Sequence, residues 1–149
     1  MSDKQNNLPV NPNLFRLPSQ ETDVPWLGAQ RRKGTYPETT NRSGKWLIFV
    51  PREQIDNIWL IIKEATEEGI LGNTAKVSTA SSNPNSTEPN NNVICVYTYD
   101  WADEQDVRRI REELRKLGIT QKIPYKTNEA TRSGQYRVRG HQKISKYYE

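Results

Sequence analysis

The 149-residue sequence has a single cysteine and a single histidine, which excludes two common ways of stabilising a small fold. Cys95 cannot form a disulfide within the chain, and a structural zinc site needs about four cysteine or histidine ligands. Cys95 lies in an apolar stretch, which favours a buried structural thiol. His141 lies in a polar tail, where solvent exposure is more common than catalysis. We therefore expect no metal, no cofactor and a reducing, cytoplasmic location.

The sequence also lacks long apolar runs and the familiar catalytic motifs. Hydrophobic residues make up 33% of the chain, and no run approaches the roughly 18 apolar residues that cross a bilayer. The first residues lack the pattern of a secretory signal. There is no Gly-rich phosphate loop, no Gly-x-Ser-x-Gly elbow and no His-Glu-x-x-His helix. We expect a protein of one domain without a membrane partner.

Charge is distributed unevenly along the chain. Residues 121–149 carry 7 lysines and arginines against 2 acidic residues, whereas residues 47–120 carry 8 against 12. A basic segment of this kind indicates a partner with negative charge. The plain alternative is a basic tail that serves only solubility.

Composition and periodicity divide the chain into an irregular arm, residues 1–35, and one domain, residues 36–149. The arm is rich in asparagine, proline and charge. Its one exception is "DVPWLG", because Trp26 and Leu27 can dock on the domain surface.

Within the domain, the predicted order is strand, helix, strand, strand, helix, strand. The predicted strands cover residues 44–51, 74–80, 93–99 and 122–127, with a last extended stretch at "QYRV". The helices "PREQIDNIWLIIKEATEEG" and "DWADEQDVRRIREELRKLG" lie between them, each ending in a glycine suited to a left-handed terminus.

This order predicts an α+β fold, a βαββαβ antiparallel sheet with both helices on one face. The two most apolar strands, residues 44–51 and 93–99, would then be central. Pro124 argues for an edge position of the last long strand.

Basic and phenolic residues on the strands are the candidates for a functional site. Because side chains alternate along a strand, Tyr97 shares a side with Cys95, while Ile94 and Val96 face the helices. The candidates on the helix-free face are Lys45, Lys76, Tyr97, Tyr125, Lys126, Arg132 and Arg137. Cations and hydroxyls suit a phosphorylated peptide or another anionic ligand. Alternatively, this face is polar only because it meets water.

Four segments, "SGKWLIFVP", "LGNTAKVST", "VICVYTYDWADEQDVRRI" and "IPYKTNEATRSGQY", resemble the domain family named for phosphothreonine lyase. The resemblance covers about residues 36–149 and implies a fold like that of mRNA-cap-binding initiation factors. A more distant similarity runs to bacterial effector phosphothreonine lyases. These enzymes remove phosphate from phosphothreonine by β-elimination, with neither metal nor water.

The resemblance implies roles for individual residues. Lys76 matches the lysine that removes the Cα proton, and Tyr97 matches a tyrosine at a strand end. Lys126 corresponds loosely to a phosphate-binding arginine, and Arg132 matches the arginine within "RSG". A further arginine of the family falls at Gln135 here, where the nearby Arg137 can substitute.

One departure bears on catalysis, because the general-acid histidine of the effectors falls at Leu47. Loss of a general acid costs on the order of 10²–10⁴ in rate. The sequence therefore leaves several functions open. The first is a carbon–oxygen lyase acting on a phosphorylated peptide or another phosphoester, with Lys76 as its catalytic base and Lys45 among the phosphate ligands. The alternative is a non-catalytic module for a phospho-ligand, a nucleotide or RNA, with a base stacked on Trp46 or Trp101. A scaffold partner of a larger protein is the third.

Overall fold

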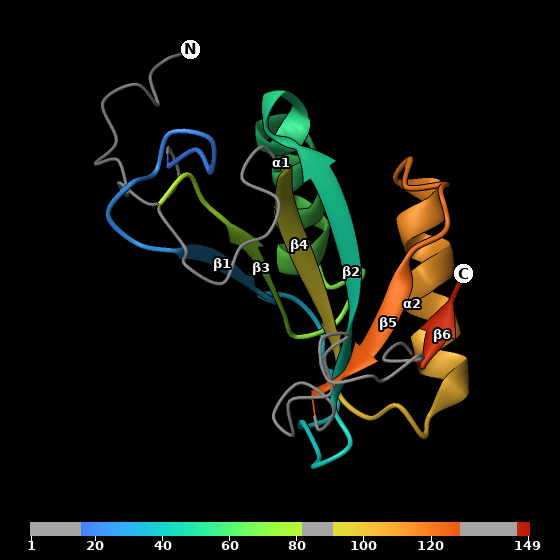
Figure 1. Cartoon of the computed structure of the whole chain (residues 1–149). Coiled ribbons are helices and arrows are strands. Elements are labelled where there is room, and N and C mark those ends of the chain that lie inside the picture. Colours follow the sequence, from blue (N-terminus) through green and yellow to red (C-terminus); the bar gives the residue numbers. More distant parts are fainter. Residues whose placement is uncertain (1–15, 82–90, 129–145) are drawn as a thin grey trace.

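The computed structural model describes residues 16–81, 91–128 and 146–149. Six strands form one antiparallel sheet in the order β1-β3-β4-β2-β5-β6. They are β1 (Trp26–Gln30), β2 (Gly44–Pro51), β3 (Thr74–Ser78), β4 (Asn91–Thr98), β5 (Pro124–Thr127) and β6 (Tyr147–Tyr148). The apolar strands β2 and β4 lie at the centre, as predicted (Figure 1).

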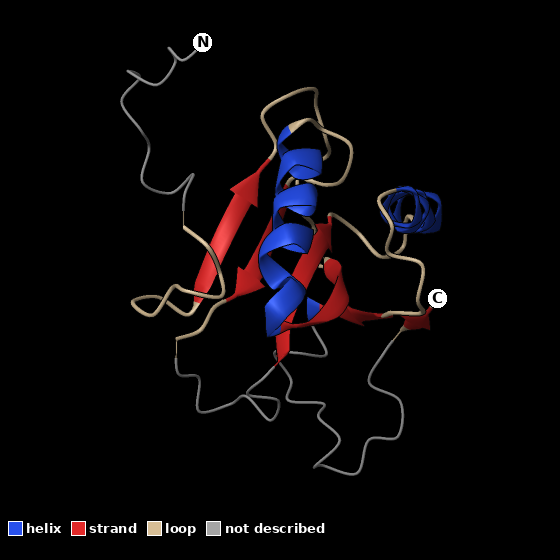
Figure 2. Ribbon diagram, turned by 90° about the horizontal axis from the view of Figure 1, so that it is seen from above, coloured by secondary structure: helices blue, strands red, loops and turns tan. Residues whose placement is uncertain are grey.

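Both helices, α1 (Arg52–Glu67) and α2 (Glu104–Lys116), lie on one side of the sheet (Figure 2). The predicted α+β class and helix placement are therefore confirmed. Pro51 immediately precedes α1, and the Asp103 side chain accepts a hydrogen bond from the Asp106 backbone at the start of α2. Gly69 and Gly118 follow the two helices with φ of 83° and 105°, the left-handed conformation that the sequence predicted.

The core fills the space between the helices and one face of the sheet. Trp46 and Ile48 from β2 and Val96 from β4 are fully buried there, and the indole nitrogen of Trp46 donates to the Val107 carbonyl at 3.1 Å. The helices cover them with a stripe of buried apolar residues, namely Ile55, Trp59, Ile62, Val107, Ile110 and Leu114. Burial of this size supplies the main stabilising contribution to the fold.

The structure corrects the expectation of an irregular arm through residue 35. Residues 26–30 form β1, which pairs with β3 from Trp26 opposite Ser78 to Gln30 opposite Thr74. The strand is short and contains a glycine and a glutamine, so its hydrophobic signal is weak. Its alternation is nevertheless present, because Ala29 is buried on the helix side while Gly28 and Gln30 are exposed.

The structure also corrects the predicted edge position of β5. This strand pairs with β2 on one side and with β6 on the other, Pro124 opposite Tyr148 and Tyr125 opposite Tyr147. The two-residue β6 is too short to give a periodic signal in the sequence. The predicted stretch "QYRV" lies outside the described residues.

Candidate functional site

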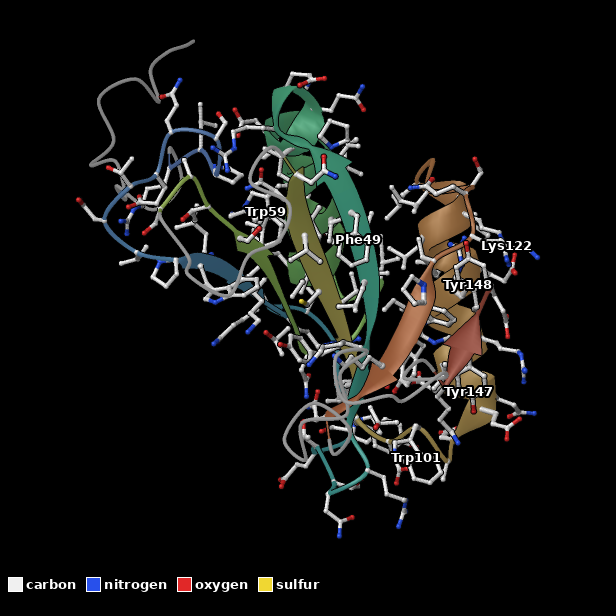
Figure 3. All side chains as sticks on the ribbon, viewed as in Figure 1. Phe49, Trp59, Trp101, Lys122, Tyr147 and Tyr148 are labelled. Carbon is white, nitrogen blue, oxygen red and sulfur yellow. The ribbon has the colours of Figure 1, made fainter. Side chains whose placement is uncertain are left out.

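The side of the sheet without helices, here called the open face, carries a different set of side chains from the covered face. On β2 the residues that alternate with the core are Lys45, Leu47 and Phe49, and Phe49 is 53% exposed (Figure 3). On β4 the corresponding residues include Cys95, which lies opposite Leu47, and Tyr97, which lies opposite Lys45. The strands that build the core therefore also present a basic and aromatic surface.

Lys76 on β3 lies beside the centre of the open face. Its cross-strand partners are Gly28 on β1 and Cys95 on β4. The Lys76 ammonium lies 4.1 Å from the centroid of the Trp26 ring and 6.0 Å from that of Tyr97. No ion pair of Lys76 occurs among the described residues, and its charge is stabilised by these aromatic faces.

Lys45 and Lys126 are direct cross-strand partners on β2 and β5. The Lys45 ammonium lies 5.7 Å from the centroid of the Tyr97 ring and donates to Asn128 Oδ1 at 3.1 Å. Burial lowers the pKa of Lys126 from its ordinary value. As cross-strand partners, the two lysines extend from neighbouring strands on the same side of the sheet.

Cys95 lies among these lysines and is 3% exposed. Burial raises the pKa of its thiol, while the charges of Lys45, Lys76 and Lys126 act in the opposite direction. Three ammonium groups from three strands therefore act on one point of the sheet. Burial also raises the pKa of the Tyr97 phenol well above its ordinary range, so its hydroxyl remains a hydrogen-bond donor at neutral pH.

The structure thus brings together four of the residues predicted for the site: Lys45, Lys76, Tyr97 and Lys126. The prediction for Tyr125 is wrong, because this side chain is fully buried in the core, where its hydroxyl bonds to that of Thr98. Arg132, Arg137 and His141 lie outside the described residues. Within the described ranges, no group of three or more histidine, cysteine, aspartate or glutamate side chains is placed to hold a metal ion.

The tryptophans have other positions than the stacking hypothesis required. Trp46 is fully buried in the core, so it cannot stack on a ligand. Trp101 is half-buried at the lower end of the sheet in Figure 3, where the Lys146 ammonium lies 4.2 Å from its ring centroid. The tryptophan on the open face is Trp26, which sequence reasoning had assigned only to surface docking. The alternation of Trp26, Gly28 and Gln30 was the signal for it.

An open cavity of about 430 Å³ lies beside Lys76 along β1. Its charged lining residues are Arg31, Arg32, Lys63 and Lys76, with Glu67 as the one acid. Lys63 pairs with Glu67 at 2.7 Å, and Arg32 lies 3.9 Å from the same carboxylate. Positive charge therefore exceeds negative charge along this edge of the sheet.

Fold and site together define an α+β domain with a basic, aromatic surface on the uncovered side of its sheet. The chain belongs to the family described as basophilic leukemia-expressed protein Bles03, whose family model matches residues 35–132. The comparisons give no support to the phosphothreonine lyase name that the sequence resemblance suggested.

Among solved structures, the protein is similar to eIF4E-3 of Ascaris suum in its crystal structure with the m2,2,7G cap, with a TM-score of 0.44 and 23% sequence identity. The similarity covers 57% of this chain and 50% of that chain, so it spans about half the length of the other protein. In the part of the chain that the structure describes, neither helix is long and apolar enough to cross a bilayer.

Proposed function

We propose that this protein is a binding module that holds a phosphorylated ligand on the open face without converting it. The observation that carries the proposal is the placement of like charges. Lys45 and Lys126 are direct cross-strand partners, and the ammonium groups of Lys45 and Lys76 lie near one Tyr97 ring. A phosphate dianion placed among these ammonium groups is attracted by each of them, which supports the assignment of an anionic ligand to this face.

The surrounding groups match the chemistry of a phosphate monoester. Its oxygens are acceptors, and the lysine ammonium groups and the Tyr97 hydroxyl are donors. The rings of Trp26 and Tyr97 flank the Lys76 ammonium and limit its contact with water. Charge-assisted hydrogen bonds are stronger where water is partly excluded.

Calorimetric titration with N-acetyl-phosphothreonine amide tests the proposal. We expect wild type to bind this ligand and Lys76→Met to bind it about 10- to 100-fold more weakly. The reason is that one charge-assisted hydrogen bond contributes about 1.5–3 kcal/mol. Lys116→Met is the matched control, because Lys116 is an exposed lysine of α2 that contacts Glu113. Absence of binding by wild type, or equal affinities of the two variants, would overturn the proposal.

β-Elimination at the same site is the second candidate, favoured by the placement of Lys76 beside Tyr97. Two features favour binding over elimination. Leu47, opposite Cys95, stands where the effectors have their general acid, and it cannot transfer a proton. The contact of Lys76 with the Trp26 ring is a cation–π contact, which suits a lysine that holds a ligand by its charge.

Mass spectrometry of a phosphothreonine peptide after prolonged incubation separates the two candidates. We expect the peptide to be recovered intact. Loss of the mass of H3PO4 with wild type but not with Lys76→Ala would establish elimination instead. Loss of the mass of HPO3 would indicate hydrolysis, for which the described residues offer no metal site.

A nucleotide or single-stranded RNA is the remaining ligand for this face. An oligouridylate titrated at increasing salt distinguishes it from a phosphorylated peptide. Binding that is tighter than that of the phosphothreonine ligand and that falls steeply with salt would favour RNA. We expect the opposite order of affinities, because the aromatic ring nearest Lys76 is already covered by its ammonium group.

A further inference from the structure

The strand β1 forms one edge of the sheet, and half of its backbone groups point away from the sheet. At its two ends, Arg31 donates to the Asn73 carbonyl at 2.8 Å, and Thr79 donates to the Pro25 carbonyl at 3.0 Å. Because hydrogen-bonded pairs alternate in an antiparallel ladder, the odd-numbered residues of β1 bond to β3. The N–H and C=O groups of the even-numbered residues, Trp26, Gly28 and Gln30, therefore point outward, and β3 is the one strand of the described chain that pairs with β1.

This edge lacks the features that usually prevent a strand from pairing with another chain. Protected edges carry charged side chains, a proline or a β-bulge. The sequence of β1 is WLGAQ, with no charge and no proline, and its register with β3 runs without interruption. The edge is therefore suited to accept an additional strand, as in other peptide-binding sheets.

Gly28 has no side chain, so β1 places nothing at this position between an added strand and Lys76. A Cβ atom at Gly28 would meet the Ala75 carbonyl oxygen at 3.8 Å and no other described atom within 4 Å, so a small side chain has room there. Lys76 lies directly across from Gly28 on β3. Strands lie about 4.8 Å apart. A long side chain opposite Gly28 on an added strand can therefore cross the glycine and approach the Lys76 ammonium.

The charges along the edge specify the chemistry of the added strand. Four cationic residues and one acidic residue, Glu67, line the cavity beside β1. A second cavity of about 270 Å³, at the Trp26 end of the strand, is lined by Trp26, Leu27 and Trp59 together with Arg16 and Lys63, which pair with the carboxylates of Glu21 and Glu67. Acidic and phosphorylated side chains complement such an edge, and the apolar rings accept an aliphatic neighbour.

We infer that the protein binds an extended phosphopeptide that adds to β1 as a further antiparallel strand, with its phosphorylated side chain crossing Gly28 to reach Lys76. This inference rests on the proposed function, because it assigns the ligand class of the same site. The peptide backbone supplies affinity through the outward groups of Trp26, Gly28 and Gln30, and the phosphate supplies specificity.

Backbone N-methylation tests the added strand with the wild-type full-length chain. The probe is a capped peptide of about nine residues, within the usual strand length, with one central phosphothreonine among threonine, valine and alanine. We expect it to bind at least about tenfold more tightly than N-acetyl-phosphothreonine amide, since each net hydrogen bond contributes about 1 kcal/mol. N-methylation of the phosphothreonine, whose N–H would pair with Gly28, should remove this gain. N-methylation of the next residue, whose N–H faces solvent in an added strand, is the matched control and should preserve the gain.

Gly28→Val tests the path of the phosphorylated side chain. The branched side chain fits a strand and has room on the open face, so the variant should unfold at a temperature equal to or above that of wild type. We expect it to bind the phosphorylated and unphosphorylated peptides with similar, weak affinity. If Gly28→Val fails to fold, the N-methylated peptides still decide the question with wild type.

The outcomes distinguish this inference from the function on which it rests. If the capped amino acid and the peptide bind equally well and N-methylation has no effect, the site binds phosphate but the added strand is wrong. If neither binds, the proposed function fails. A dimer in sedimentation experiments that the phosphopeptide does not dissociate would assign the β1 edge to a second copy of this chain and overturn the inference.

Discussion

The two faces of β2 and β4 are made by the same strands but contribute differently to the protein. On the covered face, Trp46, Ile48 and Val96 are fully buried against the helices. On the open face, Lys45 stands directly opposite Lys126, and Phe49 is more than half exposed. The covered face thus contributes most of the free energy of folding, while the open face carries the cations to which we assign the proposed ligand.

The two faces also differ in the surroundings of a positively charged side chain, Arg111 near the covered face and Lys126 on the open face. Arg111 of α2 is fully buried beside the core, and its guanidinium donates to the backbone carbonyls of Ile119, Gln121 and Glu149 at 2.7–2.9 Å. Arg111 thereby joins α2 to the segment that precedes β5 and to the residue that follows β6. Lys126 has another lysine as its cross-strand neighbour. The hydrogen bonds from each nitrogen of the buried Arg111 guanidinium give this charge a structural role, whereas the proposed role of Lys126 is to attract a ligand.

The largest expected effect is the difference in unfolding free energy between two substitutions on β2, one on the covered face and one on the open face. Trp46→Ala should lower the free energy of unfolding by about 3–5 kcal/mol, because it leaves a large cavity and removes the indole donor to the Val107 carbonyl. Phe49→Ala, on the same strand, should change it by about 0.5 kcal/mol, because the ring is 53% exposed. Urea denaturation measures both values. Equal losses would show that the open face also belongs to the core.

The next effect concerns the buried cation. Arg111→Met should lower the free energy of unfolding by about 3 kcal/mol, because it removes the guanidinium donors of the Ile119 and Gln121 carbonyls and one of the two donors to the Glu149 carbonyl. Arg115→Met on the same helix is the control, with an expected loss of at most about 1 kcal/mol, because Arg115 is partly exposed and the Glu149 carbonyl keeps Arg111 as a donor. Chemical denaturation of both variants checks the difference. A small loss at Arg111 would mean that water replaces the guanidinium.

The smallest expected effect has the opposite sign. In the absence of ligand, Lys126→Met should raise the free energy of unfolding by about 0.2–1 kcal/mol, because it removes an ammonium group whose burial opposes its charge. Lys122→Met is the control, since the Lys122 ammonium lies 5.9 Å from the centroid of the Tyr148 ring and no gain is expected there. Differential scanning calorimetry detects the change. With phosphopeptide present, the advantage of Lys126→Met should disappear.

The same substitution has a pH dependence whose sign follows from burial. Burial lowers the pKa of Lys126 in the folded state below its unfolded value of about 10.4. Below the folded-state pKa, Lys126 is protonated in both the folded and the unfolded protein, and burial of its charge lowers the stability of wild type by the full amount. Between the folded and unfolded pKa the unfolded state binds more protons, so wild-type stability rises with pH. The advantage of Lys126→Met should therefore shrink in alkaline solution. An advantage that grows with pH would contradict the assigned cause.

The fold was predictable from the sequence where signals of several kinds agreed. Pro51, Gly69 and Gly118 mark helix ends that the structure places at the same positions. The apolar stretch around Val96 identified a central strand. β1 was missed because five residues with one glycine give little periodicity, and β6 because two residues give none.

The candidate site was predictable only in part, because it depends on register. Alternation along β4 placed Tyr97 on the open face, but no local pattern shows that Lys45 faces Lys126 or that Gly28 faces Lys76. These pairs follow from how four strands align. Trp26 could not be assigned to the site without β1, because its position over Lys76 depends on that strand.

Cys95 also makes the open face accessible to a simple chemical assay. It is the only sulfhydryl group of the chain, so an alkylating reagent such as iodoacetamide can mark no other sulfhydryl. At 3% exposure, its sulfur reacts only when the side chains around it move apart. The labelling rate of the unmodified protein therefore reports how often the surface opens, and a bound molecule that bridges the lysines should slow that rate without any engineered fluorophore.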